Sequence, residues 1–126
     1  MQLNPYARHV ELCERLVGAT MLGEVEWTVE EETAFVCRRS SGTVGIRSRD
    51  RDGEPPYELV IFNSNGAKVE TLLSEWSAEE EPALWNRALA DLYRTARRNA
   101  LGVDKLLDDL LAELPATQPA QEPARL

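Results

Sequence analysis

The longest regular pattern in the chain runs from Ser77 to Leu114, where apolar residues recur at the spacing of a helix. At about 100° per residue, one side of this segment is apolar: Trp85, Ala88, Leu89, Leu92, Ala96, Ala100, Val103, Leu106, Leu107 and Leu110. Because the phase continues across Gly102, we expect one long amphipathic helix with at most a bend at this glycine. Such a stripe has to be buried against a sheet, a helix or another chain.

Capping residues predict where the two helices begin. Ser77-Ala78-Glu79-Glu80 forms a capping box, in which the serine oxygen and the glutamate carboxylate each bond a free N–H group at the start of the long helix. Asn4-Pro5 also favours a helix start, because asparagine caps free N–H groups and proline suits the first helical position. Apolar residues then recur at helical spacing, and Gly23 ends the run, so a first helix is expected from Pro5 to Met21.

Between the helices the period changes to two, which is typical of half-buried strands. The first strand is expected from Glu24 to Val29, and Glu30-Glu31-Glu32 is expected to form the turn that follows it. Four further strands are expected at Ala34–Cys37, Val44–Ile46, Tyr57–Phe62 and Lys68–Leu73. Short turns and one charged loop over residues 49–56 connect them, so the pattern predicts an antiparallel meander.

These elements predict an α+β fold in one domain over residues 1–114, with a helix, a meander of about five strands and a long C-terminal helix. Residues 115–126 are proline-rich and polar, which predicts a disordered tail. Ala34–Cys37 and Leu59–Phe62 are apolar on both faces, so the sheet is expected to be covered on both sides. Either the helices pack on opposite faces, or both lie on one face and a second chain covers the other.

Composition narrows the class of partner. The chain has 126 residues and a formal net charge of −8, which argues against non-specific binding to a phosphate backbone and favours a basic partner. No apolar run approaches the roughly 18 residues of a membrane span, and the first residues lack the layout of a signal peptide. We therefore expect a cytoplasmic protein with no membrane contact, in which Cys13 and Cys37 are small buried apolar residues.

Candidate catalytic groups are few. His9 and Cys13 are four residues apart on the first helix, but Cys13 points into the apolar stripe, whereas a cysteine nucleophile needs exposure and a lowered pKa. Glu30-Glu31-Glu32 and Glu79-Glu80-Glu81 are consecutive, so their carboxylates do not converge as acid–base chemistry or calcium requires. We therefore assign no catalytic, cofactor-binding or metal-binding residue and expect a protein that is not an enzyme.

Arginines gather in two places that are candidate interaction sites. One group lies on neighbouring strands and the charged loop, and the other lines the outer face of the long helix: Arg38, Arg39, Arg47, Arg49 and Arg51, then Arg87, Arg94 and Arg98. Guanidinium groups bind phosphates and carboxylates, but interleaved aspartates favour an ordinary solvated face with pairs such as Arg87 with Asp91. Trp76, just ahead of the helix cap, is a further candidate interface residue.

The sequence therefore favours a non-catalytic protein-interaction module, an adaptor or a homodimerising regulatory domain, with no cofactor and with another protein chain as its partner. Two alternatives stay open. One is an acidic chaperone-like or antitoxin-like protein that masks a basic client. The other is a nucleotide or nucleic-acid binder that uses the group from Arg38 to Arg51, which the net charge makes unlikely.

The small size, acidity and helix–sheet–helix layout are similar to those of class I type III secretion chaperones. This resemblance is one of layout, without a shared motif and with a different strand order. It implies an acidic dimer that binds unfolded segments of other proteins, in line with the chaperone-like alternative.

Overall fold

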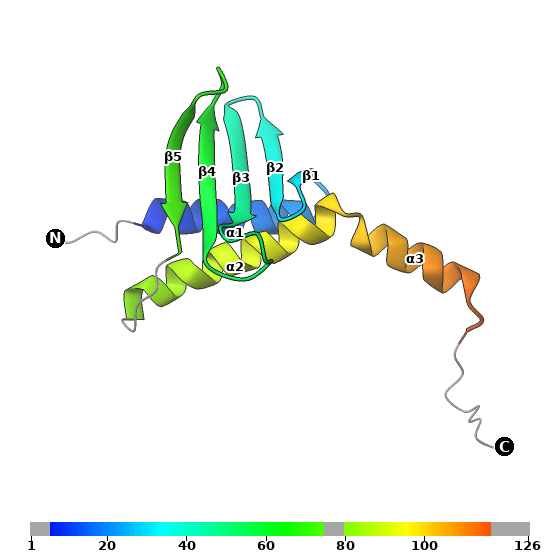
Figure 1. The fold of residues 1–126 in the computed structure, drawn as a ribbon. Helices are drawn as coiled ribbons and strands as arrows, with labels where there is room; N and C mark the ends of the chain where they lie inside the picture. Colours follow the sequence, from blue (N-terminus) through cyan, green and yellow to red (C-terminus); the bar gives the residue numbers. More distant parts are fainter. Residues whose placement is uncertain (1–5, 75–79, 117–126) are drawn as a thin grey trace.

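The computed structural model describes residues 6–74 and 80–116, which form one antiparallel sheet and three helices (Figure 1). The helices are α1 (Ala7–Met21), α2 (Glu80–Ala100) and α3 (Val103–Glu113). The strands are β1 (Thr28–Glu31), β2 (Ala34–Arg39), β3 (Gly42–Ser48), β4 (Tyr57–Asn63) and β5 (Lys68–Leu73). Each strand pairs with its sequence neighbour in the order β1-β2-β3-β4-β5, which confirms the predicted α+β meander.

One face of the sheet packs against both α1 and α2. A single hydrophobic cluster joins the two helices to alternate strand residues, including Phe35, Cys37, Ile46 and Leu59, while Val36 and Val60 are buried but lie outside this cluster. Successive strand residues point to opposite faces, so the two valines belong to the other face. Of the two arrangements that the sequence left open, the structure has both helices on one side.

Helices α1 and α2 run in the same direction. At their first turns the rings of Tyr6 and Trp85 stack with centroids 4.9 Å apart and planes within 6°. Near their last turns, Trp27 donates its indole N–H to Thr20 Oγ1 at 3.0 Å and its backbone N–H to Asn99 Oδ1 at 2.7 Å. The segment after α1 is therefore fastened to the end of α2.

The first strand begins later than predicted. Val25 and Trp27 are buried, but β1 covers Thr28–Glu31, so the expected strand from Glu24 to Val29 is wrong in its first half. The reason is the backbone N–H of Trp27, which bonds the side chain of Asn99 and not a neighbouring strand. Val29, expected on the buried face, is 47% exposed.

The predicted single long helix is also wrong, because α2 ends at Ala100 and α3 begins at Val103. Gly102 adopts φ 65° and ψ 36°, a left-handed conformation that ends a helix and that glycine adopts at little cost. The continuous apolar phase across Gly102 therefore does not reflect a continuous helix, and α3 extends away from the rest of the fold (Figure 1).

Glycine is required at position 42, the first residue of β3, because the backbone of β4 passes close to its Cα atom. A Cβ atom at this position would lie 2.3 Å from the carbonyl oxygen of Phe62 on β4. Since Gly42 pairs with Asn63 at the end of that ladder, only glycine fits where β2 turns into β3.

Several sequence predictions fall on residues that the structure does not describe. The cap at Asn4-Pro5, the capping box from Ser77, Trp76 and most of the predicted tail lie outside the described residues. Within them, α1 ends at Met21 as predicted, with Gly23 at φ 79° just beyond it. Met21, predicted to lie on the apolar stripe, is 76% exposed instead.

Candidate interaction site

Helix α3 carries an apolar face that the rest of the described chain leaves uncovered. None of its residues is buried, and Leu106, Leu110 and Leu111 are 54%, 43% and 69% exposed. Leu106 and Leu110 were predicted to continue the buried stripe of Trp85 and Leu89, which is wrong. An apolar helix face in water is unfavourable, so it indicates a binding surface.

Both edges of this apolar face are acidic. At about 100° per residue, the apolar side chains of α3 cover an arc of about 140°, with Asp104 and Asp108 along one edge and Asp109 and Glu113 along the other. The only cation of α3, Lys105, lies on the back of the helix, where its Nζ is 2.8 Å from Asp109 Oδ2. A complementary surface would have an apolar strip between two basic edges.

The second uncovered surface is the face of the sheet opposite the helices, here called the open face. Across the middle of it, register places a row of small and apolar residues side by side: Thr28, Val36, Gly45, Val60 and Thr71. At Gly45 the missing side chain leaves a shallow depression of about 60 Å³, whose lining includes Val60 and Phe62. The described residues include no helix packed on this row.

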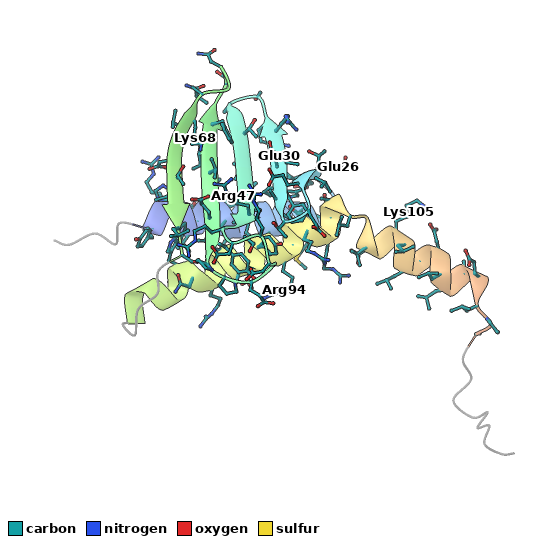
Figure 2. All side chains as sticks on the ribbon, viewed as in Figure 1. Glu26, Glu30, Arg47, Lys68, Arg94 and Lys105 are labelled. Atoms are coloured by element: carbon teal, nitrogen blue, oxygen red, sulfur yellow. The ribbon has the colours of Figure 1, made fainter. Side chains whose placement is uncertain are left out.

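Basic side chains lie on both sides of that row. On one side, Arg38 and Lys68 occupy the ends of the register row Arg38–Thr43–Phe62–Lys68. On the other side lies Arg47, whose Nη2 is 2.5 Å from Glu58 Oε1. Figure 2 shows Lys68 and Arg47 at different heights on the strands, and Lys105 far away on α3. Glu58 is thus paired with Arg47, and Glu30 is the carboxylate that lines the depression.

Two of the three predicted arginines of α2 pair with aspartates. Arg87 and Arg94 are exposed, and Asp91 pairs with Arg94 at 3.1 Å and not with Arg87 as predicted. Arg98 Nη2 lies 2.6 Å from Oδ1 of Asp104, the first acidic residue of α3. The outer face of α2 therefore carries paired surface charges, which contribute little to stability.

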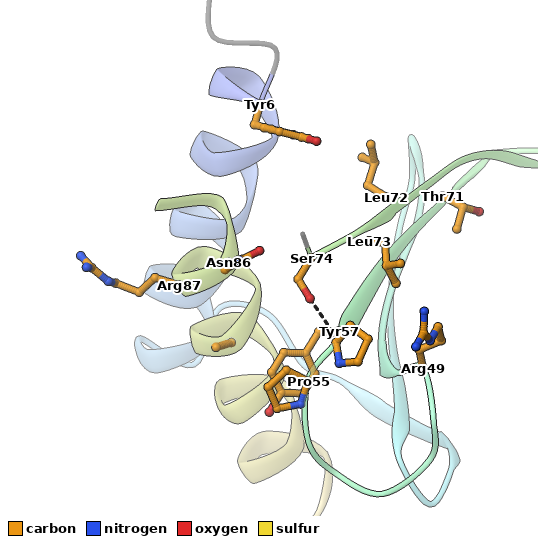
Figure 3. A pocket seen from close by; sticks show the side chains of 12 residues that line it. Tyr6, Arg49, Pro55, Tyr57, Thr71, Leu72, Leu73, Ser74, Asn86 and Arg87 are labelled. Carbon is orange, nitrogen blue, oxygen red and sulfur yellow. Dashed lines mark hydrogen bonds between the residues drawn. The ribbon is translucent and has the colours of Figure 1, made fainter. Parts of the chain in front are cut away.

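Arg49 and Arg87, from the two predicted arginine groups, both line a cleft of about 910 Å³ (Figure 3). The cleft lies at the end of β5, where Tyr57 donates its backbone N–H to Ser74 Oγ at 2.8 Å. The side chain of Arg87 points away from the other lining residues, and Arg49 Nε is 3.2 Å from Asp50 Oδ1. The two guanidinium groups thus do not converge, so the cleft lacks the paired cations that would grip a phosphate.

No family model, curated protein or solved structure matches the chain.

His9 and Cys13, to which the sequence prediction assigned no catalytic role, are not arranged as a nucleophile and its base. Cys13 is fully buried, and this burial, with a smaller contribution from Glu14, raises the pKa of its thiol to about 12. His9 Nε2 instead lies 2.9 Å from Glu70 Oε1 on β5. A thiol with so high a pKa carries no useful thiolate at neutral pH.

Neither a metal cluster nor a membrane helix is found among residues 6–74 and 80–116. In these ranges no three His, Cys, Asp or Glu side chains are placed to hold a metal ion together. No helix there has the length and apolar character that a membrane crossing needs. Cys37 is buried like Cys13, and both are free thiols.

The sequence prediction missed the exposed apolar face of α3, and it left open whether the helices cover one face of the sheet or both. Lys68 was not connected with Arg38, because the register row that joins them depends on three strand pairs. The leucines of α3 were assigned to a core because their phase matches that of α2. The signal that could have separated them is Gly102, where helix propensity is lowest.

Proposed function

We propose that this chain is a non-catalytic protein-interaction module that associates with a second copy of itself through α3 and the open face. The observation that carries the proposal is α3, an amphipathic helix of 11 residues with no buried residue. An isolated helix of that length is marginal in water, because most helical stability in proteins comes from tertiary packing. A partner surface would supply that packing.

The open face supports the same proposal. A sheet that has helices on just one side exposes its second face. Strands that are apolar on both faces, however, are typical of sheets covered on both sides. Ala34, Val36 and Val60 are each at most 6% exposed, yet they lie outside the cluster formed with the helices. Neighbouring side chains of the sheet already cover these three residues, so a further layer on this face would rest on those neighbours as well.

The candidate catalytic groups favour binding over catalysis. The Cys13 thiol is buried with a raised pKa, and the His9 imidazole is engaged with Glu70 on an edge strand. The cleft beside Ser74 holds two arginines that do not converge. In each case the side chains lack the mutual geometry of a reaction site.

A second candidate function is the masking of a basic client, as in the chaperone-like alternative. It is favoured by the acidic edges of α3, which would suit any apolar segment flanked by lysine or arginine. Nucleic-acid binding by the group from Arg38 to Arg51 has less support, since Arg47 and Arg49 are each paired with a carboxylate.

Size-exclusion chromatography with light scattering tests the proposal. We expect the native chain to elute at twice its mass of 14.2 kDa, and Leu110→Glu to elute at the single mass, because it places a charge in the apolar face of α3. Ala112→Glu is the matched control, since Ala112 lies on the opposite side of the same helix. A native chain that stays monomeric at all concentrations would overturn self-association, and binding of a lysine-rich amphipathic peptide by that monomer would favour the client-masking alternative.

A further inference from the structure

We infer that the self-association of the proposed function is a reciprocal exchange, in which α3 of each copy lies across the open face of the other copy, over the row Val36–Gly45–Val60. This inference rests on the proposed function and specifies its partner and geometry. Three independent properties of the two surfaces carry it: their charges, their lengths and the connection that links α3 to α2.

The charges of the two surfaces are complementary along one edge. The apolar face of α3 lies between Asp104 with Asp108 and Asp109 with Glu113. Arg38 and Lys68 flank the apolar row of the open face on one side, whereas Arg47 on the other side is paired with Glu58. A helix laid along this row would place one of its acidic edges over Arg38 and Lys68, which gives register and specificity.

The same charges argue against pairing α3 with itself. Two α3 helices brought face to face would bring four carboxylates from each copy to the edges of one contact, with Lys105 of each on the outside. Like charges at such distances are unfavourable. The outer face of α2 is a poorer acceptor, since Glu14 and Asp91 line the groove between α1 and α2.

The two surfaces also match in length. Helix α3 has 11 residues, so it is about 16 Å long at 1.5 Å per residue. The row crosses five strands, which span about 19 Å at about 4.8 Å per strand. Helix α2 already crosses the strands in this way on the other face, where it contacts β1, β2, β3 and β4 (Figure 1).

The connection between α2 and α3 excludes the same docking within one copy. Only Leu101 and Gly102 separate the two helices, so three Cα–Cα steps of 3.8 Å span at most about 11 Å. Adjacent layers of secondary structure lie about 10 Å apart, so α2 and a helix on the open face are separated by about 20 Å. The helix that covers the open face therefore comes from another chain.

Reciprocal exchange also explains how so short a helix can hold a dimer. One contact of an 11-residue helix is small beside the roughly 1,200–2,000 Å² that stable complexes bury in total. A two-fold axis makes the contact twice, once in each direction, and closes the assembly so that no further copies add.

Charge reversal followed by compensation tests the exchange. The variant of the open face is Arg38→Glu with Lys68→Glu, and the two variants of α3 are Asp104→Lys with Asp108→Lys and Asp109→Lys with Glu113→Lys. We expect the open-face variant, and the α3 variant whose edge faces Arg38 and Lys68, to weaken the dimer by about tenfold or more in sedimentation equilibrium, through loss of attraction at that edge. When the open-face variant is combined with each α3 variant in one chain, one combination restores the dimer, and its identity gives the direction of α3 on the sheet.

The control is Arg87→Glu with Arg94→Glu on the outer face of α2, which we expect to leave the dimer unchanged. If the native chain is monomeric, the proposed function and the exchange both fail. If the native chain is a dimer that Leu110→Glu disrupts but the open-face variant does not, the exchange and the role proposed for the open face fail, while self-association through α3 stands. Disruption by the α2 variant, or restoration by neither combination, would also overturn the exchange and leave self-association intact.

Discussion

Trp27 and Asn99 are 72 residues apart in the chain, yet the backbone N–H of Trp27 donates to Asn99 Oδ1 at 2.7 Å. This bond holds the segment before β1 against the last turn of α2, next to the point where α3 begins. We expect Asn99→Ala to lower the free energy of unfolding by about 1–3 kcal/mol, because it leaves a buried N–H group without a partner.

Urea unfolding followed by tryptophan fluorescence measures this cost. Arg97→Ala, an exposed position on the same turn, is the control and should change stability by less than about 0.5 kcal/mol. Equal effects of the two substitutions would show that the bond to Trp27 contributes nothing.

Gly42 and Gly18 form a second matched pair. A Cβ at Gly42 would meet the carbonyl oxygen of Phe62 at 2.3 Å, whereas a Cβ at Gly18, in α1, meets nothing within 4 Å. We expect Gly42→Ala to lower the melting temperature, with a cost of about 1–3 kcal/mol from displaced backbone. Gly18→Ala should raise it, because alanine is favoured over glycine in a helix by up to about 1 kcal/mol. Thermal unfolding followed by circular dichroism measures the change in melting temperature of both variants. A higher melting temperature for Gly42→Ala would contradict the pairing of β3 and β4.

Gly102 separates α2 from α3 through its left-handed conformation. Alanine disfavours that conformation by about 1–2 kcal/mol and favours helix, so we expect Gly102→Ala to merge the two helices and deepen the 222 nm signal. The merged helix would carry α3 away from its docking direction and weaken the dimer. Gly102→Asn is the control, because asparagine tolerates positive φ. A dimer unaffected by Gly102→Ala would show that the break at this glycine is not needed for association.

Burial of Cys13 predicts a loss of stability in alkali. Its pKa is raised from 9.0 to about 12, so between these pH values the folded thiol keeps its proton while the unfolded thiol loses it. The stabilisation is therefore full below pH 9 and falls as pH rises toward 12, with a slope of up to about 1.4 kcal/mol per pH unit.

Chemical denaturation across this pH range, compared with Cys13→Ala, isolates the effect. The native chain should lose stability more steeply than the variant, and both thiols should react with a disulfide reagent only after unfolding, since Cys13 and Cys37 are at most 1% exposed. Rapid labelling of Cys13 in the folded protein would contradict its burial.

The sequence predicts the elements with a strong local signal and fails where two distant segments decide the outcome. The pairing of consecutive strands followed from short turns, and the end of α1 followed from Gly23. The late start of β1 depends on Asn99, whose side chain accepts the backbone N–H of Trp27 in place of a neighbouring strand, across 72 residues of sequence. The local pattern of apolar and polar residues cannot predict a bond between residues so far apart in the chain.

The candidate site shows the same limit. Arg38, Arg47 and the leucines of α3 are visible in the sequence as charges and apolar positions, but their meaning depends on the third dimension. Whether a leucine stripe is core or surface depends on where Gly102 directs α3, and whether arginines form an edge depends on strand register. Periodicity gives the faces of an element but not what covers them.

Isotope-filtered nuclear Overhauser spectroscopy on an equal mixture of ¹³C-labelled and unlabelled chains tests the central claim most directly. The account predicts contacts between copies that join the methyl groups of Leu106 and Leu110 to those of Val36 and Val60. Spectra of a monomer, or contacts between copies that join only one α3 to the other, would contradict it.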